Sequence, residues 1–138
     1  MSHAMEYTLF LFLLLDLTNF FQAQTFNTIL VDYPRAFVPF NQYCNVMMKS
    51  RNFNIRRQCR SNDTFIHDSF ISLKELCQTA FVPCGNGLKQ CHQSSPVNVT
   101  HCLLLPNTHY PDCQYSMKFQ EQKIKIICWK NRPFYLVP

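Results

Sequence analysis

The sequence predicts a single secreted domain of the α+β class, with helices in its first part and strands in its second. A length of 138 residues suits one domain. Apolar residues recur at helical spacing up to Cys77 and alternate with polar residues after it. Eight cysteines, an even number at high density, indicate a disulfide framework formed in an oxidising compartment.

Three helices are predicted before the strands. The first could cover residues 25–32, where the β-branched Ile29 weakens it and Pro34 ends it. The second is expected to begin after Asn41, a suitable cap, and to end before Asn52. Its helical spacing rests on Tyr43, Val46, Met47 and Ser50.

The third helix and the strands follow one another along the chain. Residues 69–77 place Phe70, Leu73 and Cys77 on one helical face. Residues 97–103 and 123–126 alternate between polar and apolar, which is typical of half-buried antiparallel strands. Turns are expected at Pro83, Gly85-Asn86-Gly87, Pro106-Asn107 and Asn131-Arg132-Pro133.

The N-terminus indicates export. The apolar run from Leu9 to Leu15 is too short to cross a bilayer but suits a signal peptide, with Ala23 before the cut. We therefore expect residues 1–23 to be a signal peptide and residues 24–138 to form the extracellular domain. An uncleaved signal anchor is the alternative. No second apolar segment follows that would span a membrane.

Charge and sequons fit a basic secreted glycoprotein. Loss of residues 1–23 removes Glu6 and Asp16 and raises the formal net charge from +5 to +7. Such a protein is attracted to anionic partners such as RNA and acidic glycans. Asn62-Asp63-Thr64 and Asn98-Val99-Thr100 are two sequons that could carry glycans in a secreted chain.

Four segments carry a family resemblance. Residues 59–67 read Cys-Arg-Ser-Asn-Asp-Thr-Phe-Ile-His, and residues 110–115 read Tyr-Pro-Asp-Cys-Gln-Tyr. With the helix around Cys44 and the small loop between Cys84 and Cys91, they resemble the pancreatic-type ribonuclease (RNase A) superfamily. The first of these segments is similar to the family signature C-K-x-x-N-T-F-x-H, and the second to Y-P-x-C-x-Y.

The resemblance implies an RNase A-like fold, with three helices in the N-terminal half, a bilobed antiparallel β-sheet and four disulfides. It also implies cis proline at Tyr110-Pro111 and Arg132-Pro133. The implied bridges are Cys44–Cys102, Cys59–Cys113, Cys77–Cys128 and Cys84–Cys91. The sequence contains no C-x-x-C or H-x-x-x-H pair, so we expect no metal and no cofactor.

In the family, two histidines move protons and a lysine stabilises the phosphoryl charge during RNA cleavage. Arg60 stands at the lysine position, and Thr64 matches the threonine that reads a pyrimidine base. Arg60 and Thr64 are therefore candidate substrate-binding residues. The two histidine positions fall at aliphatic residues. These are Ile29 or Leu30 before the first cysteine, and Val137 or Pro138 after the last.

We accordingly expect no catalytic residues and a protein that is not an enzyme. His67 matches a structural histidine of the signature. The other histidines, His92, His101 and His109, are expected on strands or turns away from the catalytic positions.

The departures from the family pattern resemble the non-catalytic ribonuclease-like proteins of the male reproductive tract. The expected function is a monomeric binding module in extracellular fluid, whose partner is RNA, an acidic glycan or a cell-surface protein. A weak pyrimidine-preferring endoribonuclease and a cationic host-defence protein are the alternatives. The basic residues that could form an anionic-ligand patch, rather than a solvated face, are Lys49, Arg51, Arg56, Arg57 and Arg60.

Overall fold

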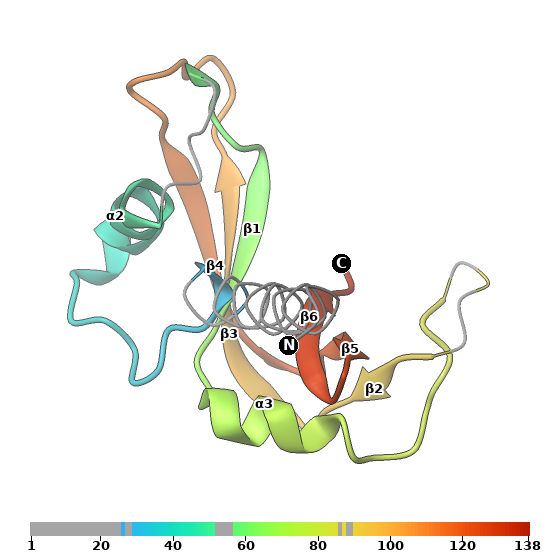
Figure 1. The fold of residues 1–138 in the computed structure, drawn as a ribbon. Coiled ribbons are helices and arrows are strands. Elements are labelled where there is room, and N and C mark those ends of the chain that lie inside the picture. Colours follow the sequence, from blue (N-terminus) through green and yellow to red (C-terminus); the bar gives the residue numbers. More distant parts are fainter. Residues whose placement is uncertain (1–25, 27–28, 52–56, 86, 88–89) are drawn as a thin grey trace, which may run out of the picture.

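The computed structural model describes Phe26, residues 29–51, residues 57–85, Gly87 and residues 90–138. The predicted signal peptide and Arg56 lie outside the described residues. Figure 1 shows a tall sheet, β1-β3-β4, against which α2 packs on one side. The second sheet, β2-β5-β6, lies at the lower end of the first, with α3 beneath.

The first predicted helix is partly described and ends earlier than expected. Phe26, Ile29 and Leu30 are helical. Val31 instead forms a parallel bridge with Ile66, and the Asp32 N–H donates to the Ile66 carbonyl at 2.9 Å. The helix therefore stops at Leu30, because the next residues extend along the tall sheet.

The helix α2 spans Tyr43–Ser50 and follows a 3-10 turn, η1, at Phe40–Gln42. The prediction that Asn41 caps this helix is wrong, because Asn41 lies inside the 3-10 turn. The turn is closed by a hydrogen bond from the Gln42 N–H to the Pro39 carbonyl at 2.9 Å. Val46 is exposed, contrary to the predicted face. The buried face consists of Tyr43, Cys44, Met47 and Met48.

The helix α3 spans Phe70–Leu76 and agrees closely with the prediction for residues 69–77. The Ser69 hydroxyl accepts a hydrogen bond from the Ser72 N–H at 3.1 Å, which caps the helix. Leu73 is fully buried and points into the core beneath the second sheet. The cap and one apolar face therefore fix this short helix.

The tall sheet contains β1 (Asn62–Ile66), β3 (Val97–Leu104) and β4 (Tyr115–Gln122), all antiparallel. The second sheet contains β2 (His92–Gln93), β5 (Lys125–Trp129) and β6 (Arg132–Leu136). The predicted strand over 97–103 is confirmed. The strand predicted from residue 123 begins at Lys125, because Ile124 turns away to exchange two hydrogen bonds with Ser94.

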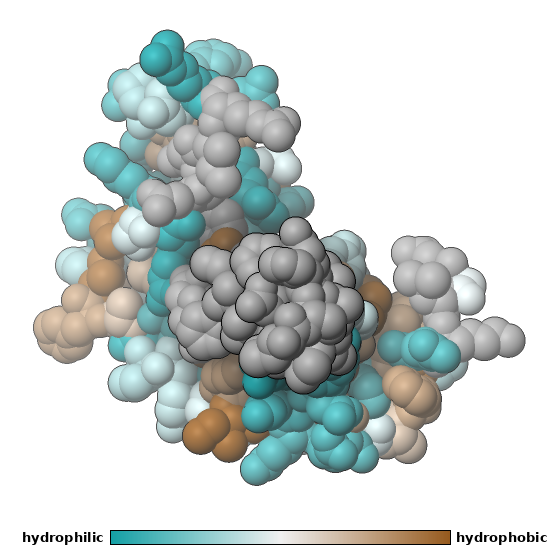
Figure 2. All heavy atoms as spheres, viewed as in Figure 1, coloured by the Kyte–Doolittle hydropathy of each residue, from teal (hydrophilic) through white to brown (hydrophobic). Residues whose placement is uncertain are grey.

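Two buried clusters form the core. One joins α2 to the tall sheet through Tyr43, Met48 and Phe65. The other joins α3 to the second sheet through Leu73 and Ile126. Hydrophobic residues also reach the surface before α2, where Phe37 and Phe40 are exposed. Figure 2 shows brown, hydrophobic residues on the surface as well.

All four implied disulfides are present, Cys44–Cys102, Cys59–Cys113, Cys77–Cys128 and Cys84–Cys91. The Tyr110-Pro111 bond is cis, as expected. The expectation for Arg132-Pro133 is wrong, since the second cis bond of the described chain precedes Pro34. In the part of the chain that the structure describes, no helix is long and apolar enough to cross a membrane.

Candidate functional site

A pocket of about 840 Å³ opens between the two sheets. Its described lining comes from the helical residues near Phe26, from β1, β3 and β4, and from β5, β6 and the C-terminal residues. Its polar lining residues include Arg51, Arg60, Asn62, Asp63, Thr64, His101, Gln122, Lys123 and Lys125. Segments that are far apart in the sequence therefore meet at one cavity.

Arg60 and Asp63 form an ion pair at the start of β1. The Arg60 Nε lies 3.0 Å from the Asp63 Oδ2, and about half of the Arg60 side chain is exposed. Burial raises the pKa of the Asp63 carboxyl group, against the opposing effects of a hydrogen bond from the Thr64 N–H and of the Arg60 charge. The candidate phosphate-binding cation therefore already has an anionic neighbour.

Thr64 is at the centre of a polar chain on the cleft side of the tall sheet. Its backbone N–H donates to Asp63 Oδ1 at 2.9 Å. Its Oγ1 lies 2.7 Å from His101 Nδ1, and His101 Nε2 lies 2.7 Å from Gln122 Oε1. Thr64 and His101 are direct partners in the β1–β3 register, which fixes their side chains next to each other.

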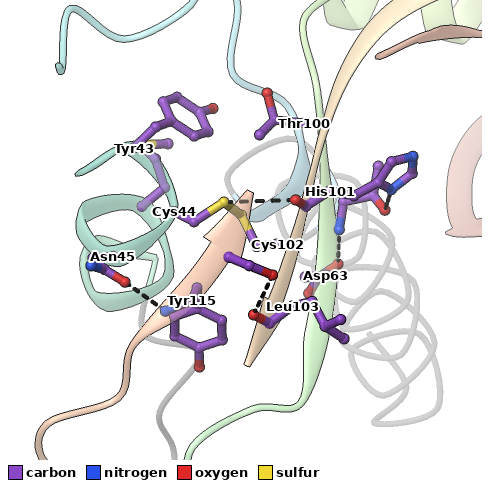
Figure 3. The surroundings of a disulfide bond; sticks show 12 residues. Tyr43, Cys44, Asn45, Asp63, Thr100, His101, Cys102, Leu103 and Tyr115 are labelled. Atoms are coloured by element: carbon purple, nitrogen blue, oxygen red, sulfur yellow. Dashed lines mark hydrogen bonds between the residues drawn. A yellow bond between two sulfur atoms is a disulfide. The ribbon is translucent and has the colours of Figure 1, made fainter. Parts of the chain in front are cut away.

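His101 is the functional candidate that the sequence analysis missed. The expectation that it lies away from the site is wrong, because it lines the same pocket as Arg60 and Thr64. The alternation of side chains along the strand could have identified it. Cys102 faces α2, where it is bridged to Cys44, so the neighbouring His101 must face the opposite side of the sheet. Figure 3 shows the His101 ring pointing away from α2.

The aliphatic residues assigned to the family's histidine positions also reach this pocket. Ile29 and Leu30 line it from the helical segment, and Val137 and Pro138 line it from the C-terminal end. The Val137 N–H donates to the Lys125 carbonyl at 3.0 Å, which holds the last residues against β5. The structure thus brings all four together, and their assignment to the histidine positions stays a prediction.

The predicted basic cluster is divided by the fold. Arg51 and Arg60 line the pocket, whereas Lys49 and Arg57 do not. Lys123 and Lys125, which the sequence analysis did not select, complete the cationic lining. Lys125 also donates to the Pro83 carbonyl at 2.9 Å.

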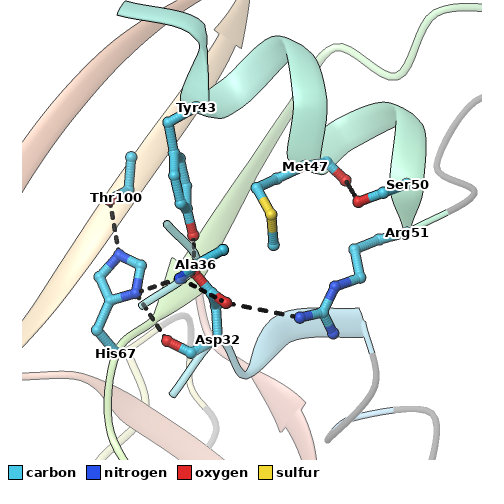
Figure 4. A network of polar contacts seen from close by, with 8 residues as sticks. All are labelled: Asp32, Ala36, Tyr43, Met47, Ser50, Arg51, His67 and Thr100. Atoms are coloured by element: carbon cyan, nitrogen blue, oxygen red, sulfur yellow. Dashed lines mark hydrogen bonds and ion pairs between the residues drawn. The ribbon is translucent and has the colours of Figure 1, made fainter. Parts of the chain in front are cut away.

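Behind the tall sheet, Asp32 organises a buried polar network. Its carboxylate accepts hydrogen bonds from the Tyr43 hydroxyl and from the Ala36 N–H, and Arg51 Nη2 lies 3.7 Å away. Desolvation by burial and the Asp32 carboxylate both raise the pKa of Tyr43. Figure 4 shows this network converging on Asp32 between α2 and the sheet.

His67 belongs to this network and not to the pocket lining. Its Nδ1 donates to the Asp32 carbonyl at 2.9 Å, and its Nε2 accepts from the Thr100 hydroxyl at 2.7 Å. Desolvation lowers the pKa of His67, although the Asp32 groups oppose the change. The prediction of a hydrogen-bonded structural role is confirmed.

The remaining histidines lie outside the polar chain of the pocket, and both sequon asparagines are at the surface. His92 is buried against Phe81, with its Nδ1 3.2 Å from the Thr79 hydroxyl, and His109 lies outside the pocket lining. Asn62 and Asn98 are both exposed, and Asn62 also lines the pocket. Among the described residues, no group of three or more histidine, cysteine or acidic side chains is placed to hold a metal ion.

The sequence profile of the family described as "Pancreatic ribonuclease" matches residues 21–138. The chain belongs to the pancreatic ribonuclease family. The Ribonuclease pancreatic of Proechimys guairae is 39% identical over 90 residues, which are 64% of this chain and 70% of the relative. The gamma-type Ribonuclease pancreatic of Rattus norvegicus is 34% identical over 110 residues, which are 79% of this chain and 72% of the relative.

The gamma-type Ribonuclease pancreatic of Rattus fuscipes is 41% identical over 93 residues, and the alignment covers 67% of this chain and 60% of the relative. Among solved structures, green turtle egg white ribonuclease superposes with a TM-score of 0.72 at 29% identity. The match covers 83% of this chain and 95% of the turtle protein. The expected RNase A-like α+β fold is therefore confirmed, although the described residues do not form three full helices.

From the missing histidines we expected that the protein is not an enzyme. That expectation is wrong, because relatives across the pancreatic ribonuclease family carry the names of enzymes. Loss of two motif residues was an insufficient basis for it, since the fold places another histidine, His101, in the same pocket.

Proposed function

We propose that the cleft of this pancreatic ribonuclease family member binds RNA at a pyrimidine nucleotide. Arg60 contacts the phosphate, and the Thr64 hydroxyl contacts the base. The observation that carries the proposal is that Arg60 and Thr64, separated by an ion-paired Asp63, line one pocket between the sheets. Arginine presents two donors to a phosphate, which suits this role.

The charge of the pocket supports a polyanionic ligand. Its described lining contains four cationic side chains and one acidic side chain, that of Asp63. The cations are Arg51, Arg60, Lys123 and Lys125. Because contacts to a nucleic-acid backbone release counterions, the affinity should decrease as salt concentration rises.

Binding is tested with short RNA oligonucleotides, of pyrimidine or purine sequence, by fluorescence anisotropy on the oxidised protein. Arg60→Ala should weaken binding to both sequences and reduce the salt dependence, whereas Thr64→Val should mainly reduce the preference for pyrimidines. Lys74→Ala, on the exposed face of α3 and outside the pocket, is the matched control. Equal affinity of all four proteins for both RNAs would contradict the proposal.

A second candidate function is slow, pyrimidine-preferring endoribonuclease activity. The enzyme names of the relatives and the presence of His101 in the pocket favour it. Aliphatic residues at two proton-transfer positions would reduce the rate by about 10⁴–10⁸ relative to a histidine-bearing relative. Cleavage of a pyrimidine-containing RNA that co-purifies with the protein and disappears in Arg60→Ala supports this function. Cleavage unchanged in that variant points to a contaminating nuclease.

The extracellular setting is part of the proposal. Four disulfides in one small domain support secretion, since such bridges persist in oxidising compartments. The exposed Asn62 and Asn98 fit glycosylation in the same pathway. Mass spectrometry of protein secreted by mammalian cells tests the cut after residue 23 and the occupancy of both sequons.

The proposal also includes the subgroup of the male reproductive tract. Arg60 and the aliphatic residues around the pocket support this assignment, because they depart from the family pattern. Transcript abundance across tissues tests it, and broad expression or expression centred on the pancreas would contradict it.

A further inference from the structure

We propose that the pocket between the two sheets also binds an amphipathic anion, a phosphate monoester with a single alkyl chain. The chain lies against the aliphatic end of the cavity, and the phosphate faces its cationic lining. This site goes beyond RNA binding and does not depend on it. The observation that carries it is that one cavity joins an aliphatic wall to a cationic one.

The aliphatic wall is an extension of the hydrophobic core. Phe26 and Ile124 are buried in the cluster that joins α3 to the second sheet, and Leu30 and Leu136 pack against the same cluster. All four line the pocket, and Val137 continues the wall. Leu30 and Leu136 are only partly buried, so each leaves apolar surface at the cavity. The pocket therefore has an apolar side that the core holds in place.

Cationic residues begin directly beside this wall. Ile124 stands between Lys123 and Lys125 in the chain, and the Val137 N–H donates to the Lys125 carbonyl at 3.0 Å. The Lys125 Nζ donates to the Pro83 carbonyl at 2.9 Å, whereas the Lys123 side chain is exposed. Lys123 can therefore contact an anion whose apolar part lies against Ile124 and Val137.

The remaining charges of the pocket favour a head group with more than one negative charge. Arg51 and Arg60 add two cations to the lining, and the one acidic residue of the described lining, Asp63, is already paired with Arg60 at 3.0 Å. A phosphate monoester carries about two negative charges at neutral pH and accepts several hydrogen bonds, so it can contact more than one of these cations.

The size and composition of the cavity also fit this ligand. Its volume of about 840 Å³ lies in the range of about 300–1,000 Å³ that is usual for small-molecule sites, which combine apolar walls with a few polar groups. The ribose and base of a nucleotide have polar edges and gain little from contact with Leu30 or Val137. An alkyl chain gains about fourfold in affinity for each methylene that becomes completely buried.

The test is an NMR titration of the secreted, oxidised protein with hexyl phosphate, methyl phosphate and hexanol. Hexyl phosphate should bind at least about tenfold more tightly than methyl phosphate, which lacks the chain, and than hexanol, which lacks the charge. Its addition should shift the amide signals of Ile124 and Val137. Equal affinities for hexyl and methyl phosphate would overturn the inference, because the aliphatic wall would then contribute nothing.

Variants at the two ends of the cavity assign the two parts of the ligand. Val137→Thr keeps the shape of the side chain but replaces a methyl group with a hydroxyl group. It should weaken hexyl phosphate by about fourfold and leave methyl phosphate unchanged. Val46→Thr, the same substitution at an exposed site on α2 outside the pocket, is the matched control and should change neither affinity. Lys123→Met should weaken both phosphates.

Equal losses for both phosphates in Val137→Thr, or no loss for either in Lys123→Met, would overturn the inference. RNA binding together with equal affinities for hexyl and methyl phosphate would overturn this inference and leave the proposed function intact. Tight binding of hexyl phosphate without affinity for pyrimidine RNA would overturn the proposed function and support the site described here.

Discussion

At the scale of single residues, Asp63 occupies two groups of the pocket that could otherwise contact a ligand, the Arg60 side chain and the Thr64 N–H. Its carboxylate pairs with Arg60 through Oδ2 and accepts the Thr64 N–H through Oδ1. A bound nucleotide would need the same cation and would approach the same backbone donor. Asp63 would therefore compete with the proposed ligand at two points, and burial raises the pKa of this carboxyl group.

We predict that Asp63→Asn strengthens the binding of pyrimidine nucleotides by about fivefold at neutral pH. The substitution removes one negative charge beside the ligand phosphate and keeps the size of the side chain. Calorimetric titration with uridine 3′-monophosphate measures the change. Glu75→Gln is the control, because it removes an exposed carboxylate that lies on α3 and outside the pocket. It should leave the affinity unchanged. Weaker binding by the Asp63 variant would show that the carboxylate supports the site.

His67 makes the stability of the fold depend on pH. Desolvation lowers its pKa in the folded protein below the ordinary value of 6.5, so in acid the unfolded chain takes up the proton first. The stabilisation due to neutral His67 is therefore present above about pH 6.5 and is lost as the pH falls through the folded-state pKa.

We predict a melting temperature that falls on acidification below pH 6.5, measured by circular dichroism with the disulfides intact. His67→Gln should be less stable at neutral pH, because the bonds to Asp32 and Thr100 change, but its melting temperature should depend less on pH. An equal pH dependence in both proteins would assign the effect to another group.

At the scale of elements, α2 and α3 show what local sequence signals can predict. Ser69 followed by an apolar face was sufficient to define α3, because the cap and the burial of Leu73 are both local. The start of α2 could not be predicted in the same way. The η1 turn after Pro39 takes up Asn41, and packing against β4, not helical spacing, determines which face of α2 is buried.

Ser69→Ala should destabilise the protein by about 1 kcal/mol, because the Ser72 N–H loses its capping acceptor. Urea unfolding of the two proteins, compared at unchanged slope, measures the difference. Ser95→Ala, in the exposed turn between β2 and β3, is the matched control and should have a much smaller effect. Equal stability of wild type and Ser69→Ala would mean that water replaces the cap.

The position of His101 illustrates a second limit at this scale. Alternation along residues 97–103 predicted the strand, and the disulfide of Cys102 defines which face is turned toward α2. The contacts of His101 with Thr64 on β1 and with Gln122 on β4 depend on the register of the three strands. A single sequence does not specify that register. Most of the fold was therefore predictable, whereas the polar chain of the cleft was not.

At the scale of the whole molecule, the bridges differ in how much of the chain they constrain. Cys59–Cys113 closes a separation of 54 residues, whereas Cys84–Cys91 closes one of 7. Chain entropy predicts stabilisations of about 4 and about 2 kcal/mol respectively. The two double serine variants, compared by calorimetric melting, should therefore differ, with removal of Cys59–Cys113 more damaging. The opposite order would indicate that the small loop makes contacts that chain entropy does not include.

The spacing of the cysteines, read through the family resemblance, anticipated the bridges and the two-sheet architecture. It did not anticipate the composition of the cavity, where the aliphatic Leu30 and Val137 meet cations from three different segments. A cavity of this kind is assembled by contacts between distant residues. Its chemistry must therefore be established from the structure even when the fold is evident from the sequence.

A glycan on Asn62 would make the size of the ligand that the pocket accepts depend on the host that produces the protein. It is exposed, lies at the beginning of β1 and lines the pocket. Protein made in a bacterial host, without glycans, would admit long and short RNA alike. The same polypeptide with an oligosaccharide on Asn62 would still admit a mononucleotide but would exclude a long strand. Preparations from the two hosts would then behave as two different proteins toward polymeric RNA.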